Sequence, residues 1–244
     1  MKLQKITKKK ASTEKPRQTR SVTHRLYDDA CGIAHALDLV GERWALLVIR
    51  ELLFGPKRFS DLRESLPGIS ANVLTQRLEG LEAAGLLVKR KLPPPAASQV
   101  YELTPWGYES EPIIRDMGRW AARSPLHDPT LPVSAVSIML SMRTMFDASR
   151  AEGFDARIGF KLGEDSFIGR VADGRLTLAR GTLDGADAIF IGTARYLAAA
   201  IYGGVPLAAL EKKGALKAEG ERRVAERYLT LFVLPPKAER AAGT

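Results

Sequence analysis

Apolar residues recur at helical spacing between residues 36 and 66, and glycine and proline interrupt the pattern. Gly41 divides the first run, which indicates a stop between two helices. The Gly-Pro pair at 55–56 ends the second helix. The spacing from residue 59 to residue 66 predicts a third helix, for which Ser60 is a suitable N-cap.

A fourth helix is predicted after the tight turn at residues 67–69, with Ser70 as its cap. Its apolar residues share one inward face: Leu74, Leu78, Leu81 and Ala84. Its polar residues turn outward: Asn72, Thr75, Gln76 and Glu79, with Arg77 near the boundary. Such a helix can enter a major groove, where Arg, Asn and Gln read base edges and hydroxyls contact phosphate. The alternative is a solvated helix face.

The segment after Gly85 predicts a two-stranded ribbon. Residues 86–91 continue into a strand, and residues 99–103 pair back across the proline-rich tip at 92–98. Helices followed by a ribbon in this order are typical of a winged helix-turn-helix, so double-stranded DNA is the leading partner. Three basic residues at the base of the wing are expected to contact phosphate: Lys89, Arg90 and Lys91.

The candidate DNA-contacting residues come from the start of the third helix, the fourth helix and the wing. They are Lys57, Arg58, Ser60, Ser70, Asn72, Thr75, Gln76, Arg77, Lys89, Arg90, Lys91, Ser98 and Gln99. We expect the fourth helix to read bases and the other two regions to position it on the backbone.

A set of short motifs in fixed order carries a family resemblance. They are Cys31, Ala36 to Gly41, Arg43-Trp44, Leu47 to Leu52, Gly55 to Leu62, Leu66 to Ser70, Val73 to Leu78, Leu81 to Leu86 and Tyr101 to Gly107. On these motifs, residues 27–123 resemble the HxlR-like winged-helix regulators, a bacterial branch near the MarR type. The resemblance implies a dimeric, sequence-specific transcription regulator, with repression expected although the family includes activators. The chain departs from the pattern in its wing tip, rich in proline and alanine, and at Trp106, where a basic residue is more usual.

Thr104 and Pro105 predict the start of a further helix, as cap and first helical residue. Its apolar residues need a cover: Trp106, Ile113, Ile114, Met117, Trp120 and Ala121. The resemblance implies that this helix and the one beginning near Cys31 join two subunits. A two-fold dimer would then present two recognition helices to a pseudo-palindromic site. The alternative is packing against the C-terminal half of the chain.

The 244 residues suffice for two domains. Residues 124–132 contain three prolines without helical or strand spacing, which is typical of a linker. The predicted organisation is a disordered basic tail at 1–26, the winged-helix domain at 27–123, the linker at 124–132, a second domain at 133–234 and a flexible tail at 235–244.

Residues 133–234 change to a mixed pattern, which makes the predicted fold class α+β. Helices are predicted at 133–149, 193–202, 206–213 and 221–231. Strands are predicted at 156–162, 166–172, 175–179, 188–192 and 216–220, with a hairpin turn at Asp173-Gly174.

The run at 187–192, the helix after Thr193, the Gly-Gly pair at 203–204 and the segment 214–220 resemble the sterol-carrier-protein-like lipid-binding domains. The resemblance implies a sheet with helices over an apolar cavity, and therefore a small apolar ligand. The candidate lining residues are Met139, Met142, Phe146, Phe160, Phe190 and Tyr202. The alternative is that these side chains are plain core.

Charge is concentrated in the N-terminal tail. Nine basic residues and one acidic residue in 1–25 give +8 of the net +9, so the remaining residues are nearly neutral. Such a tail adds salt-dependent affinity for DNA or serves only to solubilise the protein. It has no apolar signal-peptide core, and no apolar run is long enough to span a bilayer, so a cytoplasmic, nucleoid-associated protein is expected.

Cys31 is the only cysteine, which excludes an intramolecular disulfide and favours a reducing compartment. The family resemblance makes it a candidate redox sensor, through a disulfide between subunits. A helix N-terminus would lower the pKa of its thiol and the nearby Asp28 and Asp29 would raise it. The alternative is a small buried apolar residue.

Catalytic chemistry has little support in the sequence. The three histidines, His24, His35 and His127, have no partner at ligand or triad spacing, so we expect no enzyme, metal or cofactor. Two functions from different classes remain. One is a DNA-binding regulator; the other is a lipid carrier that uses the winged helix as a dimerisation or protein-interaction module.

Overall fold

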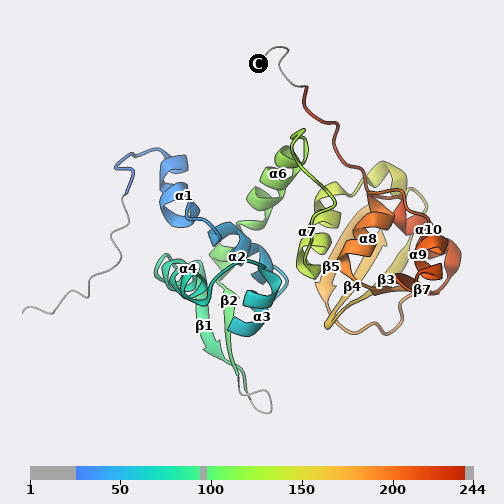
Figure 1. The fold of residues 1–244 in the computed structure, drawn as a ribbon, viewed down its shortest axis with the longest axis horizontal. Coiled ribbons are helices and arrows are strands. Elements are labelled where there is room, and N and C mark those ends of the chain that lie inside the picture. The colour runs from blue at the N-terminus through green and yellow to red at the C-terminus, as the bar shows by residue number, and fades with distance from the viewer. Residues whose placement is uncertain (1–25, 94–97, 240–244) are drawn as a thin grey trace, which may run out of the picture.

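The computed structural model describes residues 26–93 and 98–239, which form two lobes joined side by side (Figure 1). The predicted tail at 1–25, the wing tip at 94–97 and the last residues at 240–244 lie outside the described residues. We call residues 32–122 the N-terminal half and residues 135–229 the C-terminal half. Among the described helices, none is long and apolar enough to cross a membrane.

The N-terminal half is a winged helix-turn-helix, as the pattern predicts. Its elements are α1 (Gly32–Val40), α2 (Ala45–Leu52), α3 (Phe59–Ser65), α4 (Ala71–Ala83), β1 (Leu87–Lys91), β2 (Gln99–Leu103), α5 (Pro105–Tyr108) and α6 (Glu111–Ala122). Strands β1 and β2 are antiparallel, with Leu87 opposite Leu103 and Lys91 opposite Gln99. Leu74, Leu78 and Leu81 of α4 are buried against this core, which confirms the predicted inward face.

One predicted helix start in this half and one predicted helix need correction. Helix α3 begins at Phe59 with Arg58 in the cap position, so Ser60 lies inside the helix and is not its cap. The Arg58 N–H instead donates to the Asp61 carboxylate at 3.3 Å.

The single helix predicted after Thr104 is two helices, α5 and α6. Thr104 does cap α5, accepting from the Gly107 N–H at 3.0 Å. The break falls just before Pro112, which tolerates only the first turn of a helix because it lacks an N–H and its ring displaces the carbonyl four residues earlier.

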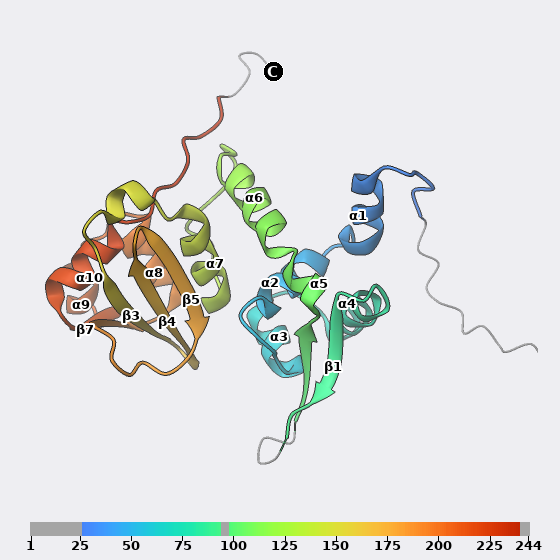
Figure 2. The same ribbon diagram turned by 180° about the vertical axis from the view of Figure 1, so that it is seen from behind.

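The C-terminal half is a sheet with its helices gathered on one face (Figure 2). Its elements are α7 (Ala135–Met145), the 3-10 helix η1 (Ala148–Ala151), β3 (Ala156–Leu162), β4 (Asp165–Ala172), β5 (Arg175–Arg180), β6 (Ala188–Gly192), α8 (Ala194–Ile201), α9 (Leu207–Lys212), β7 (Leu216–Gly220) and α10 (Arg222–Leu229). The strand order is β5-β4-β3-β6-β7, and only the β3–β6 pair is parallel.

Helix α7 is shorter than the predicted 133–149. It ends at Met145 because Phe146 is extended and forms an isolated antiparallel bridge with Phe232. The inward face of the sheet is aromatic: Phe160 stacks on Phe190 at 5.9 Å between ring centres, and both rings contact Tyr228.

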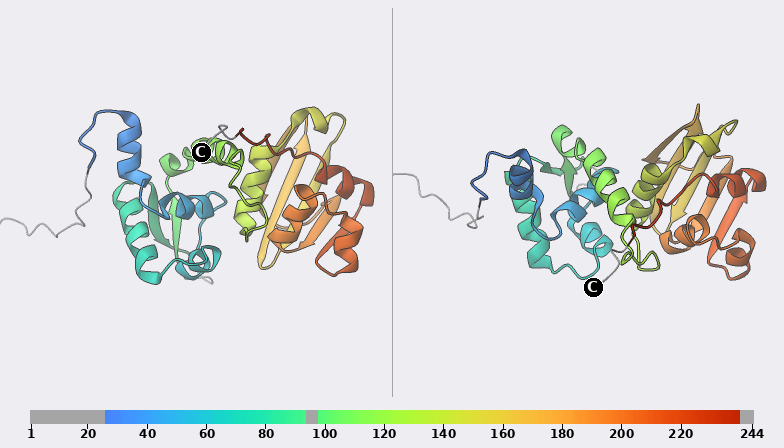
Figure 3. Two further views of the ribbon diagram at one scale, coloured as in Figure 1. Left: turned by 45° about the horizontal axis from the view of Figure 1, so that its top comes forward. Right: turned by 90° about the horizontal axis from the view of Figure 1, so that it is seen from above.

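Helix α7 lies between the N-terminal half and the sheet (Figures 1 and 3). The buried apolar side chains of the two halves form one continuous cluster. Phe54 meets Phe167 of β4 edge to face, with ring centres 5.6 Å apart. The Ser134 hydroxyl, at the start of α7, donates to the buried Glu51 of α2 at 2.7 Å.

The predicted linker at 124–132 forms no helix or strand. The start of the predicted flexible tail lies along it: Lys237 donates to the carbonyls of Ala122 and Ser124, each at 3.0 Å, and the Ala238 N–H donates to the Arg123 carbonyl at 2.7 Å. Residues 237 and 238 are therefore held to the chain, which corrects the prediction for this part of 235–244.

Candidate nucleic-acid interface

Helix α4 presents a polar face to solvent. Asn72, Thr75 and Gln76 are exposed, while Leu74 and Leu78 between them are buried. Ser70 holds the first turn, accepting the Val73 N–H at 3.2 Å. The helix lies on the side of the N-terminal half away from the C-terminal half (Figures 1 and 2). Its exposed side chains can therefore reach a ligand that the second lobe does not obstruct.

Arg77 does not share this face, although the sequence placed it among the base readers. Its Nε donates to the Arg43 carbonyl at 2.9 Å, and its Nη2 lies 2.8 Å from a Glu42 carboxylate oxygen. The side chain is only 19% exposed. The guanidinium therefore ties α4 to the loop before α2, which makes Arg77 a positioning residue.

Lys57 also lies elsewhere, in the interior and 6% exposed. Its Nζ is 2.8 Å from the fully buried Glu51 carboxylate and 2.8 Å from the Ser65 hydroxyl. Burying an ionised carboxylate is unfavourable unless a cation lies beside it, which explains why the Lys57 side chain points inward. We therefore leave Lys57 out of the interface. The sequence feature that could have indicated the buried position of Lys57 is Glu51, an acidic residue among the apolar residues of α2.

The backbone of Lys57 links the loop before α3 to the wing. Its N–H donates to the Tyr101 carbonyl at 3.0 Å, and the Tyr101 N–H donates back at 2.9 Å. Nearby, the Arg58 Nε donates to the Ser98 hydroxyl at 3.1 Å. Arg58 and Ser60 remain exposed at the start of α3.

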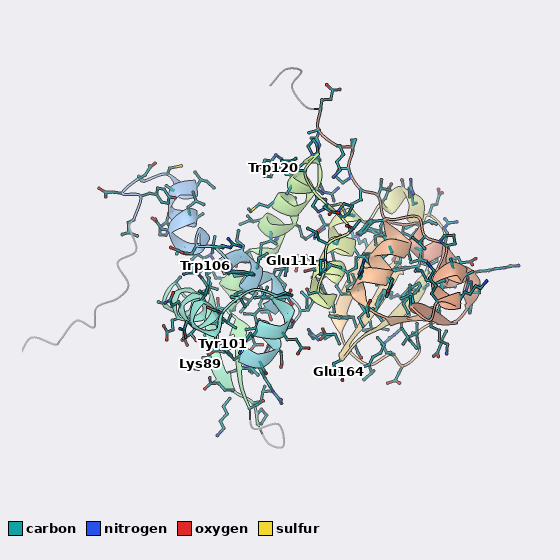
Figure 4. The ribbon with its side chains drawn as sticks, viewed as in Figure 1. Lys89, Tyr101, Trp106, Glu111, Trp120 and Glu164 are labelled. Atoms are coloured by element: carbon teal, nitrogen blue, oxygen red, sulfur yellow. The ribbon has the colours of Figure 1, made fainter. Side chains whose placement is uncertain are left out.

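The wing carries three exposed cations with different neighbours. Lys89 lies over the Tyr101 ring, 5.7 Å from its centre, and the two residues form the middle pair of the ribbon (Figure 4). Arg90 pairs with Glu102 on the opposite strand. Lys91 and Gln99 are exposed where the described strands end. Helix α4 contacts β1, so the helix and the wing are neighbours in the fold.

A second exposed surface is apolar and lies on α1 and α6. Ile33 is 68% exposed, Ile113 61% and Trp120 75%. The opposite side of α6 contacts α7: Arg115 donates to the Arg143 carbonyl at 2.7 Å, and Arg119 donates to the Thr144 carbonyl. Packing against the C-terminal half therefore covers only one side of α6, and Trp106 and Trp120 remain at the surface (Figure 4).

Cys31 is exposed and directly precedes α1. Its N–H donates to an Asp29 carboxylate oxygen at 2.9 Å. The alternative of a small buried apolar residue is therefore wrong. Across residues 26–93 and 98–239, no group of three or more His, Cys, Asp or Glu side chains could hold a metal ion.

The proposed ligand-lining residues are mostly core. Met139, Met142, Phe160 and Phe190 are fully buried, so they do not line an open site. Phe146 packs on Phe232 with ring centres 6.1 Å apart. Tyr202 alone of the six lines a cavity, and that cavity lies at the junction of the two halves. The rings that could have walled a cavity over the sheet pack on one another in this structure.

Comparisons with known proteins agree with this fold. The family model described as HxlR-like helix-turn-helix matches residues 39–127. The uncharacterised HTH-type transcriptional regulator YvaP of Bacillus subtilis (strain 168) is 35% identical over 86 residues, which are 35% of this chain and 80% of YvaP. The HTH-type transcriptional regulator YodB of the same organism is 36% identical over 86 residues, 35% of this chain and 77% of YodB.

Among solved structures, the reduced form of YodB from B. subtilis is 33% identical, and the match covers 40% of this chain and 98% of that one with a TM-score of 0.37. The relatives named here are HTH-type transcriptional regulators, and the matched region holds the recognition helix and the wing. This chain therefore belongs to the HxlR-like helix-turn-helix family of DNA-binding transcription regulators.

Proposed function

We propose that this protein acts as a homodimer that reads a specific DNA sequence with Asn72, Thr75 and Gln76 of α4. The observation that carries the proposal is the exposed polar face of α4, capped at Ser70 and backed by buried leucines. Asn and Gln can each pair with an adenine edge, and a threonine hydroxyl with phosphate or base. Each good bidentate contact contributes about 1–3 kcal/mol of discrimination.

Phosphate contacts from flanking residues would set the register of α4. The candidates are Arg58, Ser60, Ser70, Lys89, Arg90, Lys91, Ser98 and Gln99. All are exposed except Ser98, which is partly buried beside Arg58. Arg90 is already paired with Glu102, so Lys89 and Lys91 are the stronger cations here. Such contacts add affinity that falls with salt and is independent of sequence.

The exposed apolar surface of α1 and α6 supports dimerisation. Large side chains such as Ile33, Ile113 and Trp120 gather on two helices that leave them without a cover among the described residues. Large exposed apolar side chains mark an interaction site, and a two-fold partner would cover those of both helices. Trp120→Asp should convert the dimer to a monomer in sedimentation velocity, whereas Tyr196→Asp on α8 should not. A wild-type monomer would contradict the proposal.

We propose that the protein represses transcription, because a bound dimer blocks the DNA that it covers. A reporter driven by the chain's own upstream region should be derepressed when the regulator is deleted. Loss of reporter expression on deletion would reverse the sign. Regulation of this kind would place the protein with the nucleoid in the cytoplasm.

The decisive experiment measures binding of the full chain to a duplex from its own upstream region and to a scrambled duplex, over a range of salt. The wild type should prefer its own region by about a hundredfold or more. The triple variant Asn72→Ala, Thr75→Ala, Gln76→Ala should lose most of that preference. Glu79→Ala, on the same exposed face, should retain it. Equal, salt-sensitive binding to both duplexes by the wild type would overturn the proposal.

The DNA-binding experiment also tests the alternative function, a lipid carrier. The apolar cavity at the junction of the two halves is the observation that favours this alternative. We propose that residues 133–234 form the sterol-carrier-protein-like domain that the sequence predicts. The antiparallel sheet with one parallel pair and helices over one face supports this. A carrier would retain lipid through purification and bind both duplexes weakly and alike.

Cys31 is proposed as an oxidant sensor that forms a disulfide with the partner's Cys31. Its exposure at the start of α1, within the proposed dimer surface, supports this. Two thiols would each lose one hydrogen to the oxidant as one S–S bond forms. Diamide should produce a covalent dimer on a non-reducing gel that Cys31→Ser does not form, and its absence in the wild type would exclude the sensor.

A further inference from the structure

A cavity of about 710 Å³, partly open to solvent, lies at the junction of the two halves. Its walls come from four helices and the linker: Leu46 of α2, Ile114 and Gly118 of α6, Ser141 of α7, Ala198 of α8 with its C-cap Tyr202, and Leu131. The lining is mainly apolar, and the volume lies within the range of small-molecule sites. Neither half makes this cavity alone.

Two hydroxyl groups in the wall leave one hydrogen-bond donor unused. The Oη of Tyr202, directly after α8, and the Oγ of Ser141, on α7, are 2.8 Å apart. One bond between two hydroxyls uses one of their two hydrogens. Within the described residues neither hydroxyl has another hydrogen-bond partner. Burial raises the pKa of Tyr202 to about 12, so this phenol remains a donor at neutral pH.

We propose that the junction cavity binds a small apolar molecule bearing a carboxylate or carbonyl oxygen, which accepts the unused hydrogen of the Tyr202 and Ser141 pair. The apolar walls remove the body of the molecule from water, and the single acceptor orients it. Leaving a part-buried donor unpaired is costly, so an acceptor-bearing ligand has an advantage over a hydrocarbon of the same shape. The occupant is a small molecule because both halves of one chain form the walls.

The position of the cavity gives its occupancy a route to the DNA-binding half. Helix α6 contributes both Gly118 and Trp120 to the wall, and Trp120 is also exposed on the proposed dimer surface. Arg115 and Arg119 of α6 hydrogen-bond to carbonyls at Arg143 and Thr144 of α7. A ligand between these helices would change how α6 packs on α7, and with it the spacing of two recognition helices. This regulatory part rests on the proposed function.

The site is tested first without DNA, on the full chain. The probes are cis-parinaric acid, an apolar chain with a carboxylate, and diphenylhexatriene, a hydrocarbon without an acceptor. Both should show saturable fluorescence at one site per chain. Gly118→Leu should weaken both about tenfold or more, because a Cβ there meets no atom within 4 Å and the side chain can grow into the cavity. Gly80→Leu, also a helical glycine with open space, should change neither.

The acceptor is tested by removing both oxygens. The double variant Tyr202→Phe, Ser141→Ala should weaken parinaric acid about tenfold and leave diphenylhexatriene unchanged. Equal loss of both probes would show that the hydroxyl pair only supports the wall and would overturn the acceptor. No saturable binding to the wild type, or unchanged binding to Gly118→Leu, would overturn the site.

The coupling is tested by adding parinaric acid to the complex with the upstream duplex. We expect a change in affinity of about fivefold or more in the wild type and none in Gly118→Leu. Probe binding with unchanged DNA affinity would overturn the coupling alone. Probe binding by a chain that shows no sequence preference would refute the proposed function while supporting the site, so the two failures are distinguishable.

Discussion

Arg143 of α7 contacts Glu111 of α6 through both carboxylate oxygens, each 2.8 Å from its Nη1. The same guanidinium lies 4.2 Å from the centre of the Phe54 ring, next to α2, and donates to the Leu178 carbonyl of β5. One side chain of the C-terminal half therefore contacts two segments of the N-terminal half and its own sheet. Figure 4 shows Glu111 at this junction.

Arg143→Met should lower the free energy of unfolding by about 2 kcal/mol, because Glu111 would lose a part-buried, charged hydrogen-bond partner. Urea denaturation measures this, and a cycle with Glu111→Gln should give a coupling energy of about 1 kcal/mol. Arg170→Met is the matched control. Its partner Asp155 is 3.2 Å away, but the two side chains are 62% and 65% exposed. That loss should be below about 0.5 kcal/mol, and equal losses would contradict the role of Arg143.

Lys57→Met should destabilise the fold without changing the electrostatics of DNA binding. Removing the amine leaves Glu51 buried with one cation fewer, which should cost about 2–3 kcal/mol. Adding Glu51→Gln to the variant should recover part of this loss. The slope of log affinity against log salt should remain that of the wild type, whereas Lys89→Ala should reduce it by about 1. A reduced slope in Lys57→Met would return this lysine to the interface.

Arg77→Ala should weaken binding to all duplexes by the same factor. The side chain holds α4 to Arg43 and Glu42, so its loss changes the position of the reader without removing a base contact. Unfolding should become easier by about 1 kcal/mol. Gln76→Ala is the comparison, since it should relax the preference at one base pair. If Arg77→Ala did the same, Arg77 would be a base reader.

Tyr202 should make stability depend on pH in the alkaline range. Burial raises its pKa to about 12 in the folded protein, and the hydrogen bond with Ser141 opposes that rise. Below about pH 10 the phenol is protonated in both states, so this contribution is fully present. Between pH 10 and 12 only the unfolded chain ionises, and about 2–3 kcal/mol of stability is lost.

Tyr202→Phe removes this term, so its unfolding free energy should fall less steeply than that of the wild type over the same range. Tyr228, whose pKa burial also raises, is present in both proteins, so only the smaller part of its rise that comes from Tyr202 differs between them. Parallel curves from pH 9 to 12 would show that Tyr202 ionises as easily in the folded protein as in the unfolded chain.

Sequence patterns that extend over only a few residues predicted much of the fold. The strands at 156–162, 188–192 and 216–220 have the predicted bounds, because alternation and turn residues act between neighbours along the chain. The polar face of α4 followed from the spacing of its leucines for the same reason. The break between α5 and α6 was also present in the sequence, in Pro112, but the apolar spacing obscured it.

The roles of particular side chains were harder to predict. Arg77 lies on a recognition helix and was grouped with the base readers, but its partner Arg43 is 34 residues away. The sequence predicts Lys57 as a surface cation, but its Nζ lies 2.8 Å from a carboxylate oxygen of the buried Glu51. Apolar spacing in the sequence is the same for residues that line a cavity and for residues of a core. In the structure four of the candidate lining residues are fully buried: Met139, Met142, Phe160 and Phe190.

Most of the helices and strands, the winged helix-turn-helix and the face that α4 turns to solvent could be predicted from the sequence, because each depends on periodicity and turn chemistry within a few residues. The internal roles of Lys57 and Arg77, and the place where an apolar cavity remains, follow from tertiary packing. The cavity depends on the docking of α7 against α2 and α6, which brings Ser134 to Glu51 and Arg143 to Glu111 from 83 and 32 residues away. Contacts over such separations follow from the packing of whole surfaces, which no local pattern encodes.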